Sequence, residues 1–118
     1  MEMLINDYNN FQTIQVDFNR IFPYLRLEFI SKSGEVRSAQ VRINSSQKPL
    51  SNYRIDSDNI ITITPEDTVG DLGKKFLKIY GLNVLVLRKS GKAWLETSLT
   101  ESWTLAEQNK QGEQLSNS

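Results

Sequence analysis

The same spacing of apolar residues occurs twice along the chain, and this repeated pattern constrains the fold more than any other feature. Five large apolar side chains begin at Phe11, and five more begin at Val69, 58 positions later. Both sets follow the offsets 0, 3, 7, 10 and 11, which place side chains on one face of an α-helix. The pairs are Phe11 with Val69, Ile14 with Leu72, Phe18 with Phe76, Ile21 with Ile79, and Phe22 with Tyr80. The spacing predicts amphipathic helices over residues 11–22 and 69–80.

The ends of both predicted helices carry matching signals. Asn10 and Thr68 precede the two apolar runs, and their side chains are suited to accept hydrogen bonds from the first free amides of a helix. Pro23 ends the first helix, because the residue before a proline avoids the helical region. Gly81 ends the second, because glycine adopts the left-handed conformation of a helix C-cap without strain.

The second predicted helix contains two internal glycines, Gly70 and Gly73. Each costs about 1 kcal/mol relative to alanine on an exposed helix face. We expect close packing of this helix on a sheet to account for both.

Each helical pattern is followed by a strand, a turn and a return strand. Residues 24–30 alternate apolar and charged side chains, as a half-buried strand does, and residues 82–87 form a nearly continuous apolar run. Turn residues that tolerate positive φ follow both strands. The turns lie at Ser33-Gly34 and Ser90-Gly91, and the return strands at residues 35–43 and 92–97.

Two explanations of the repeated pattern remain open. One is a tandem duplication of a helix-strand-strand unit whose two copies share one sheet, and the other is chance agreement between two ordinary amphipathic helices followed by strands. Both predict an α+β domain with a mostly antiparallel sheet of four or five strands and helices on one face. The expected order is α-β-β-(β)-α-β-β-α, with the optional strand at residues 60–64, where Pro65 stops it.

The chain is long enough for one domain, which we expect to span residues 11–108. Residues 1–10 are interpreted as an N-terminal arm. Residues 44–59 are rich in serine, asparagine and aspartate and predict a long surface loop. Thr104 and Glu107 have the Ser/Thr-x-x-Glu form of a capping box, which predicts a short last helix. Residues 109–118 are polar and predict a disordered tail.

The run ITITPEDTVGDLGKKF, residues 61–76, resembles the strand-to-helix entry of ubiquitin-like β-grasp domains. The resemblance implies a β-grasp-like fold as the alternative to the tandem layout. The chain departs from that family in its N-terminal helix, its long loop and its lack of a terminal Gly-Gly pair, so conjugation chemistry is not implied. The whole chain is also similar to small bacterial α+β proteins of undetermined function, a resemblance that implies no activity.

The inventory of side chains excludes most catalytic chemistry. The chain has no histidine and no cysteine, which removes imidazole bases, thiol nucleophiles, disulfides and the usual zinc ligands. Glu66, Asp67 and Asp71 cluster where the positive end of a helix favours carboxylates, and turn chemistry explains Asp56 and Asp58. No phosphate-loop or dinucleotide motif is present. We therefore expect no enzyme, no cofactor and no metal site.

The N-terminus has neither the basic segment nor the apolar run of a signal peptide, and no stretch approaches the length of about 18 apolar residues that a membrane span needs. A cytoplasmic location and no membrane partner are therefore expected.

A non-catalytic binding or interaction module is the function that these exclusions favour, with a protein partner or self-association. Its candidate surfaces are the sheet face of Arg26 and Glu28, the long loop at residues 44–59, the region of Trp103, and the exposed edge of residues 60–64, which could pair with a partner strand.

Nucleic-acid binding is the alternative. A predicted hairpin and the preceding helix carry basic residues and a tryptophan, which could contact phosphates and stack on a base if they faced the same side. The zero net charge and the ordinary role of lysine in solubility argue against it. The candidate partner-binding residues are Arg88, Lys89, Lys92, Trp94, Lys74 and Lys78.

Overall fold

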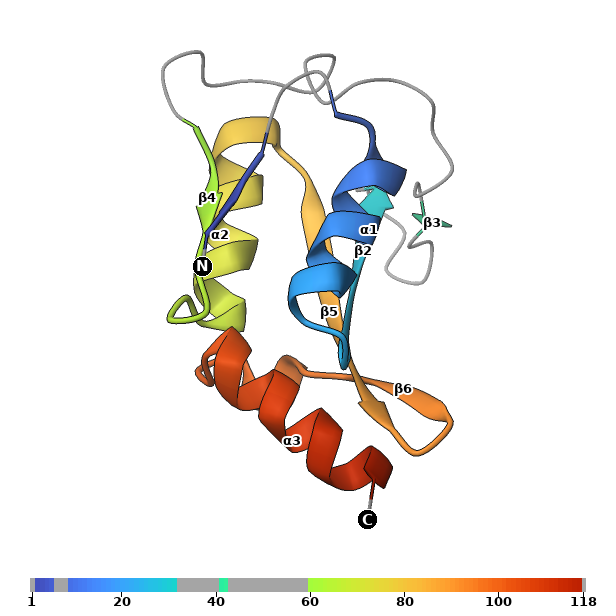
Figure 1. Ribbon diagram of the computed structural model, residues 1–118. Coiled ribbons are helices and arrows are strands. Elements are labelled where there is room, and N and C mark those ends of the chain that lie inside the picture. The colour runs from blue at the N-terminus through green and yellow to red at the C-terminus, as the bar shows by residue number, and fades with distance from the viewer. Residues whose placement is uncertain (1, 6–8, 32–40, 43–59, 118) are drawn as a thin grey trace.

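The computed structural model describes residues 2–5, 9–31, 41–42 and 60–117, and these residues form an α+β fold (Figure 1). The predicted fold class is therefore confirmed. The elements are β1 (Met3–Leu4), α1 (Phe11–Ile21), β2 (Leu25–Ser31), β3 (Val41–Arg42), β4 (Thr62–Ile63), α2 (Val69–Tyr80), β5 (Asn83–Ser90), β6 (Ala93–Glu96), the 3-10 turn η2 (Ser98–Thr100) and α3 (Leu105–Asn117).

The main sheet is antiparallel and has the strand order β3-β2-β5-β6. Its central pair, β2 and β5, runs in register from Leu25 opposite Arg88 to Ile30 opposite Asn83. The β5–β6 hairpin turns at Gly91, whose φ of 62° favours glycine. The predicted turn at residues 33–34, most of the predicted strand 35–43 and the predicted loop 44–59 lie outside the described residues.

Helices α1 and α2 pack on one face of the main sheet, as their repeated apolar spacing predicts. Phe29 of β2 lies between them, with ring centroids 4.6 Å from Phe11 of α1 and 5.4 Å from Phe76 of α2. Side chains directly opposite each other in neighbouring strands point to the same face, so Leu27 and Val86 belong to the same core.

The N-terminal residues belong to the fold, which corrects their interpretation as an arm. Strand β1 pairs with β4 in a separate two-stranded sheet, with Met3 opposite Ile63. Met3 and Ile5 are buried, and the Ile5 amide donates to the Ile61 carbonyl at 3.0 Å. The strand predicted at residues 60–64 therefore pairs with the start of the chain and takes no place in the main sheet.

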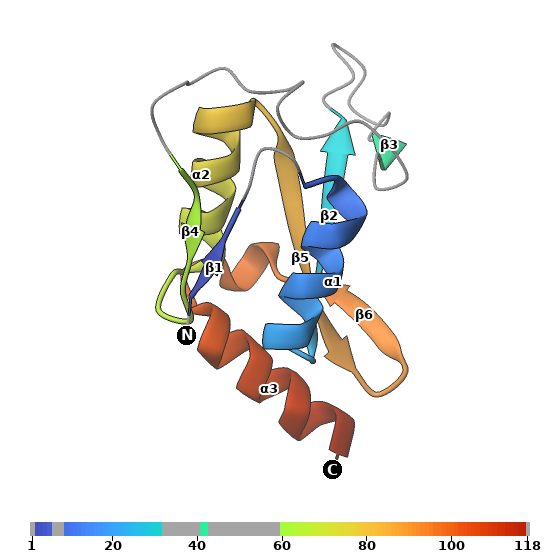
Figure 2. The same ribbon diagram turned by 45° about the horizontal axis from the view of Figure 1, so that its top comes forward.

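The last helix is longer than predicted, and the expectation of a disordered tail from residue 109 was wrong. Helix α3 continues to Asn117 and crosses the hairpin end of the main sheet (Figures 1 and 2). Its buried positions are Leu105, Gln108 and Gly112, at the spacing of one helix face. Only one of these three residues is a large apolar residue, so the buried face carries almost no hydrophobic signal.

The starts of α2 and α3 cap each other. The capping box predicted at Thr104 and Glu107 is present, and the predicted cap Thr68 forms a second capping box with Asp71. In addition, the Val69 amide donates to the Trp103 carbonyl at 3.2 Å, and the Leu105 amide to the Asp67 carbonyl at 2.8 Å. These bonds satisfy helix amides that have no partner within their own helix. The Gly70 amide donates to the Glu101 carbonyl at 2.9 Å and holds the end of η2 beside the start of α2.

Candidate functional site

The residues of the predicted basic hairpin do not form one surface. Arg88 points to the side of α3, where its Nη1 donates to Gln108 Oε1 at 2.8 Å and its guanidinium lies 5.6 Å from the ring centroid of Trp103. Lys89 follows Arg88 in β5 and pairs with Trp94 of β6. Because successive side chains of a strand point to opposite faces, Lys89 and Trp94 lie on the other face from Arg88.

The remaining predicted partner-binding residues are separated as well. Lys92 is exposed beside the hairpin turn, and Lys74 and Lys78 are exposed on α2. Figure 1 shows α2 and the hairpin turn at opposite ends of the molecule. Arg26 and Glu28 form an ion pair of 3.4 Å on the face of the sheet away from α1 and α2, but Glu28 is buried there, with 8 % of its surface exposed.

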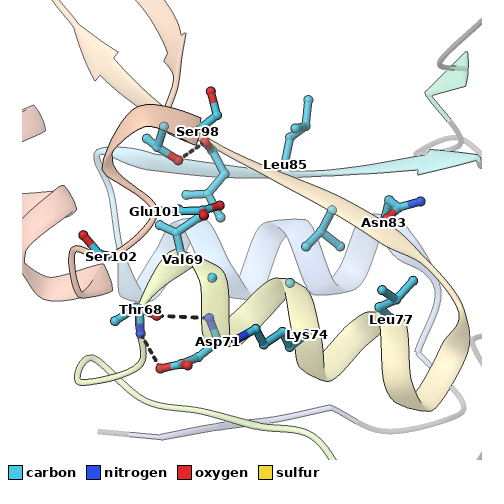
Figure 3. Close-up of a pocket in the computed structure, with 15 residues that line it drawn as sticks. Thr68, Val69, Asp71, Lys74, Leu77, Asn83, Leu85, Ser98, Glu101 and Ser102 are labelled. Carbon is cyan, nitrogen blue, oxygen red and sulfur yellow. Dashed lines mark hydrogen bonds between the residues drawn. The ribbon is translucent and has the colours of Figure 1, made fainter. Parts of the chain in front are cut away.

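A groove of about 550 Å³ lies between α2, β5 and the segment around η2 (Figure 3). Helix α2 contributes Gly70, Gly73, Lys74 and Leu77, and β5 contributes residues 83–86. One end is closed by the residues around η2, where Figure 3 shows Glu101 lying near Val69 at the start of α2.

The groove exists because β6 covers only half of β5. The β5–β6 ladder runs from Ser90 to Leu87, opposite Glu96, and the chain then turns away into η2. Thr97 Oγ1 donates to the Val86 carbonyl at 2.7 Å, so this carbonyl points to the side of β6. Because backbone direction alternates along a strand, the N–H and C=O groups of Val84 point the same way. No described strand pairs with them on that side.

The corresponding edge of β2 is closed by side chains of α1. Gln15 Nε2 donates to the Leu27 carbonyl, and Asn19 Nδ2 to the Leu25 carbonyl, each at 2.8 Å. In the repeated pattern, the residues 58 positions after Gln15 and Asn19 are Gly73 and Leu77. Glycine has no side chain and leucine has no donor. Helix α2 therefore lacks the groups with which α1 closes the edge of its strand.

Gly73 faces open space. A Cβ atom built at this position meets nothing within 4 Å, whereas one at Gly70 would lie 3.5 Å from the Glu101 carbonyl oxygen. The expectation that Gly73 allows close packing on the sheet was wrong, because α2 packs through the face of Leu72 and Phe76, and Gly73 lines the groove. The glycine weakens the helix by about 1 kcal/mol, and no contact among the described residues explains it.

Charged groups lie along the rim of the groove. Figure 3 shows Lys74 extending along α2 towards Asp71. The pKa of Asp71 is lowered from its ordinary value of 3.8 by hydrogen bonds from the Thr68 amide and hydroxyl, with a smaller contribution from Lys74 and Lys75. Asp71 is thus an anion whose negative charge the start of α2 stabilises.

This lowered pKa predicts how stability depends on pH. A carboxyl group whose pKa is lower in the folded state stabilises the fold above its unfolded pKa, and this contribution is lost as the pH falls through the folded pKa. We expect Asp71→Asn to be less stable than the wild type at about pH 7, and the difference to shrink towards about pH 3, below the ordinary value of 3.8. Urea unfolding of both proteins across this range measures it. A difference that stays constant would contradict the assignment.

Of the groove residues, sequence reasoning named only Lys74 as a candidate for partner binding. The two internal glycines of α2 were the only available signal for this site, and the sequence does not show which way they face. Among the described residues, no group of three or more acidic side chains could hold a metal ion, and no helix has the length and apolar character needed to cross a membrane. No family model matches the chain, and comparisons with curated proteins and with solved structures found no match.

Proposed function

We propose that this protein is a non-catalytic binding module that holds an extended segment of another polypeptide in the groove between α2 and β5. The observation that carries the proposal is the open edge of β5 facing Gly73. An added strand can pair with the main-chain groups of Val84, which is a common mode of peptide recognition. The Gln15 side chain, which closes the corresponding edge of β2, has no counterpart in α2, because Gly73 takes the position of Gln15 in the repeated pattern.

The size of the groove suits a short ligand of modest affinity. The open edge at residues 83–85 is about 10 Å long at the rise of a strand. Two or three main-chain hydrogen bonds are worth about 1 kcal/mol each, and one buried apolar side chain adds about 2 kcal/mol. The sum of about 4–5 kcal/mol corresponds to a dissociation constant of about 0.2–1 mM. Such a value is typical of a transient interaction.

Nucleic-acid binding has less support. Its candidate residues are divided between α2 and two faces of the β5–β6 hairpin, and Arg88 already contacts Gln108 and Trp103 of the same chain. The exposed lysines that remain are ordinary surface residues.

The repeated pattern is also better explained by duplication than by chance, and we include this in the proposal. Two features support it. Strands β2 and β5 form the central pair, each following a helix, and each is joined to an edge strand of the sheet, β3 or β6. In this view the second copy acquired its binding edge by losing the side chains that close the first.

Peptide selection followed by chemical-shift mapping tests the proposed function. A displayed library of random heptapeptides is selected on the unlabelled protein. The enriched peptides are then titrated into the ¹⁵N-labelled protein. We expect amide shifts to concentrate at Gly73 and Val84, which both line the groove. Shifts confined to the hairpin on adding a single-stranded oligonucleotide, with none from any peptide, would support the nucleic-acid alternative. The absence of groove shifts with every extended peptide, titrated to several times the expected dissociation constant, would refute the proposal.

A further inference from the structure

Resting on the proposed function, we infer that the groove selects peptides by a single large apolar side chain, aliphatic or aromatic, which points at Gly73. The ligand residue that carries this side chain lies directly opposite Val84. We call it the anchor residue.

The pleat of the sheet determines where the anchor residue points. Directly opposite residues of neighbouring strands direct their side chains to the same face. The Val84 side chain packs against the core beneath the helices, so a ligand residue opposite Val84 points towards α2. Gly73 is the residue of α2 that leaves open space in the groove, with nothing within 4 Å of a Cβ position.

The surroundings of this space are apolar. Leu77 is 46 % exposed and lines the groove beside Gly73, and Val69 is only partly buried. An apolar anchor would remove these surfaces from water, which favours binding by about 25 cal/mol per Å². The charged groups, Asp71, Lys74 and Glu101, lie at the rim. A charged anchor would lose part of its hydration against these apolar surfaces.

The register allows one anchor only. Leu87 pairs with Glu96, so Thr97 occupies the position opposite Val86 and blocks a ligand residue there. The ligand residues beside the anchor lie opposite Asn83 and Leu85, and their side chains point to the outer face of the sheet. They are therefore expected to tolerate substitution, and the position opposite Val84 sets the specificity.

A panel of peptides with one variable position tests the inference. The probes are acetyl-Thr-X-Thr-amide peptides, whose three residues fit opposite residues 83–85, with glycine, alanine, valine, leucine or phenylalanine at X. Dissociation constants come from amide shifts of Gly73 and Val84 in the wild type and in Gly73→Ala. We expect the leucine peptide to bind the wild type about tenfold more tightly than the alanine peptide. Gly73→Ala should weaken binding of the leucine and phenylalanine peptides about fivefold and leave the alanine peptide unchanged, because the new methyl group occupies the anchor space.

The outcomes separate this inference from the proposed function. Equal affinities for all five peptides, with shifts still at the groove, would overturn the anchor and leave the groove as a peptide site. No shift at the groove with any peptide of the panel or the library would overturn both. If the Val84 amide broadens with protein concentration alone and the mass doubles by light scattering, a second copy pairs with this edge, and the peptide anchor is overturned.

Discussion

Gly73→Gln is expected to abolish peptide binding at the groove while leaving the domain at least as stable as the wild type. The new side chain takes the position that Gln15 has in α1, where the amide donates to the Leu27 carbonyl at 2.8 Å. Because Gly73 and Val84 line the same groove, we expect the new amide to reach the Val84 carbonyl, so that the protein itself closes the edge of β5. Glutamine also favours a helix over glycine by roughly 0.7 kcal/mol.

The measurement pairs binding with stability. Peptides selected on the wild type are titrated into Gly73→Gln, and urea unfolding gives the free energy of each protein. A dissociation constant raised at least about tenfold, with an unfolding free energy about 1 kcal/mol higher, is the expected result. Gln12→Leu, an exposed substitution on α1, is the matched control and should change neither quantity much. Undiminished binding to Gly73→Gln would place the ligand elsewhere and contradict the proposed function.

Alanine in place of glycine is expected to have opposite effects in α2 and α3. A Cβ at Gly73 meets nothing within 4 Å, whereas a Cβ at Gly112 would lie 2.8 Å from the Cβ and 3.1 Å from the carbonyl oxygen of Tyr24. Gly73→Ala should therefore raise the free energy of unfolding by about 1 kcal/mol through helix propensity. Gly112→Ala should lower it by about 1–2 kcal/mol, because overpacking exceeds the same gain in propensity.

The position of α3 explains why Gly112 is sensitive. The Tyr24 amide donates to Asn109 Oδ1 at 2.9 Å, and Arg88 donates to Gln108. These two bonds, one turn before Gly112, hold α3 close to the strands. Thermal and urea unfolding of the two alanine variants in parallel measure the difference. A stabilised Gly112→Ala protein would show that α3 moves freely away from β2, contrary to the packing described above.

Local features of the sequence were sufficient to predict α1 and α2. Their apolar spacing is an intrahelical property, and their caps lie within three residues of the groups they bond, as Asn10 does in accepting from the Thr13 amide at 2.9 Å. The C-terminal part of α3 was not predictable in the same way. Its buried face consists of Leu105, Gln108 and Gly112, and the last two are buried only because partners from distant segments meet them.

The same distinction applies to β1 and to Arg88. Two residues at the start of the chain form a strand because Met3 pairs with Ile63, a contact that no local pattern indicates. Arg88 was assigned to a partner surface from the charge of its neighbours. The structure directs it to α3, because α3 crosses the face of β5 to which Arg88 belongs.

For the groove, the sequence determined that α2 contains two costly glycines and that β5 is an apolar strand followed by a hairpin. Only the tertiary structure decided that Gly73 faces an open edge and not a neighbouring backbone. The reason is that strand edges are closed by partners distant in sequence. The end of β6 at Glu96, the bond from Thr97 to Val86 and the side chains presented by the facing helix together decide which main-chain groups stay open. Helical periodicity is a property of neighbouring residues, whereas an unpaired edge is a property of the whole fold.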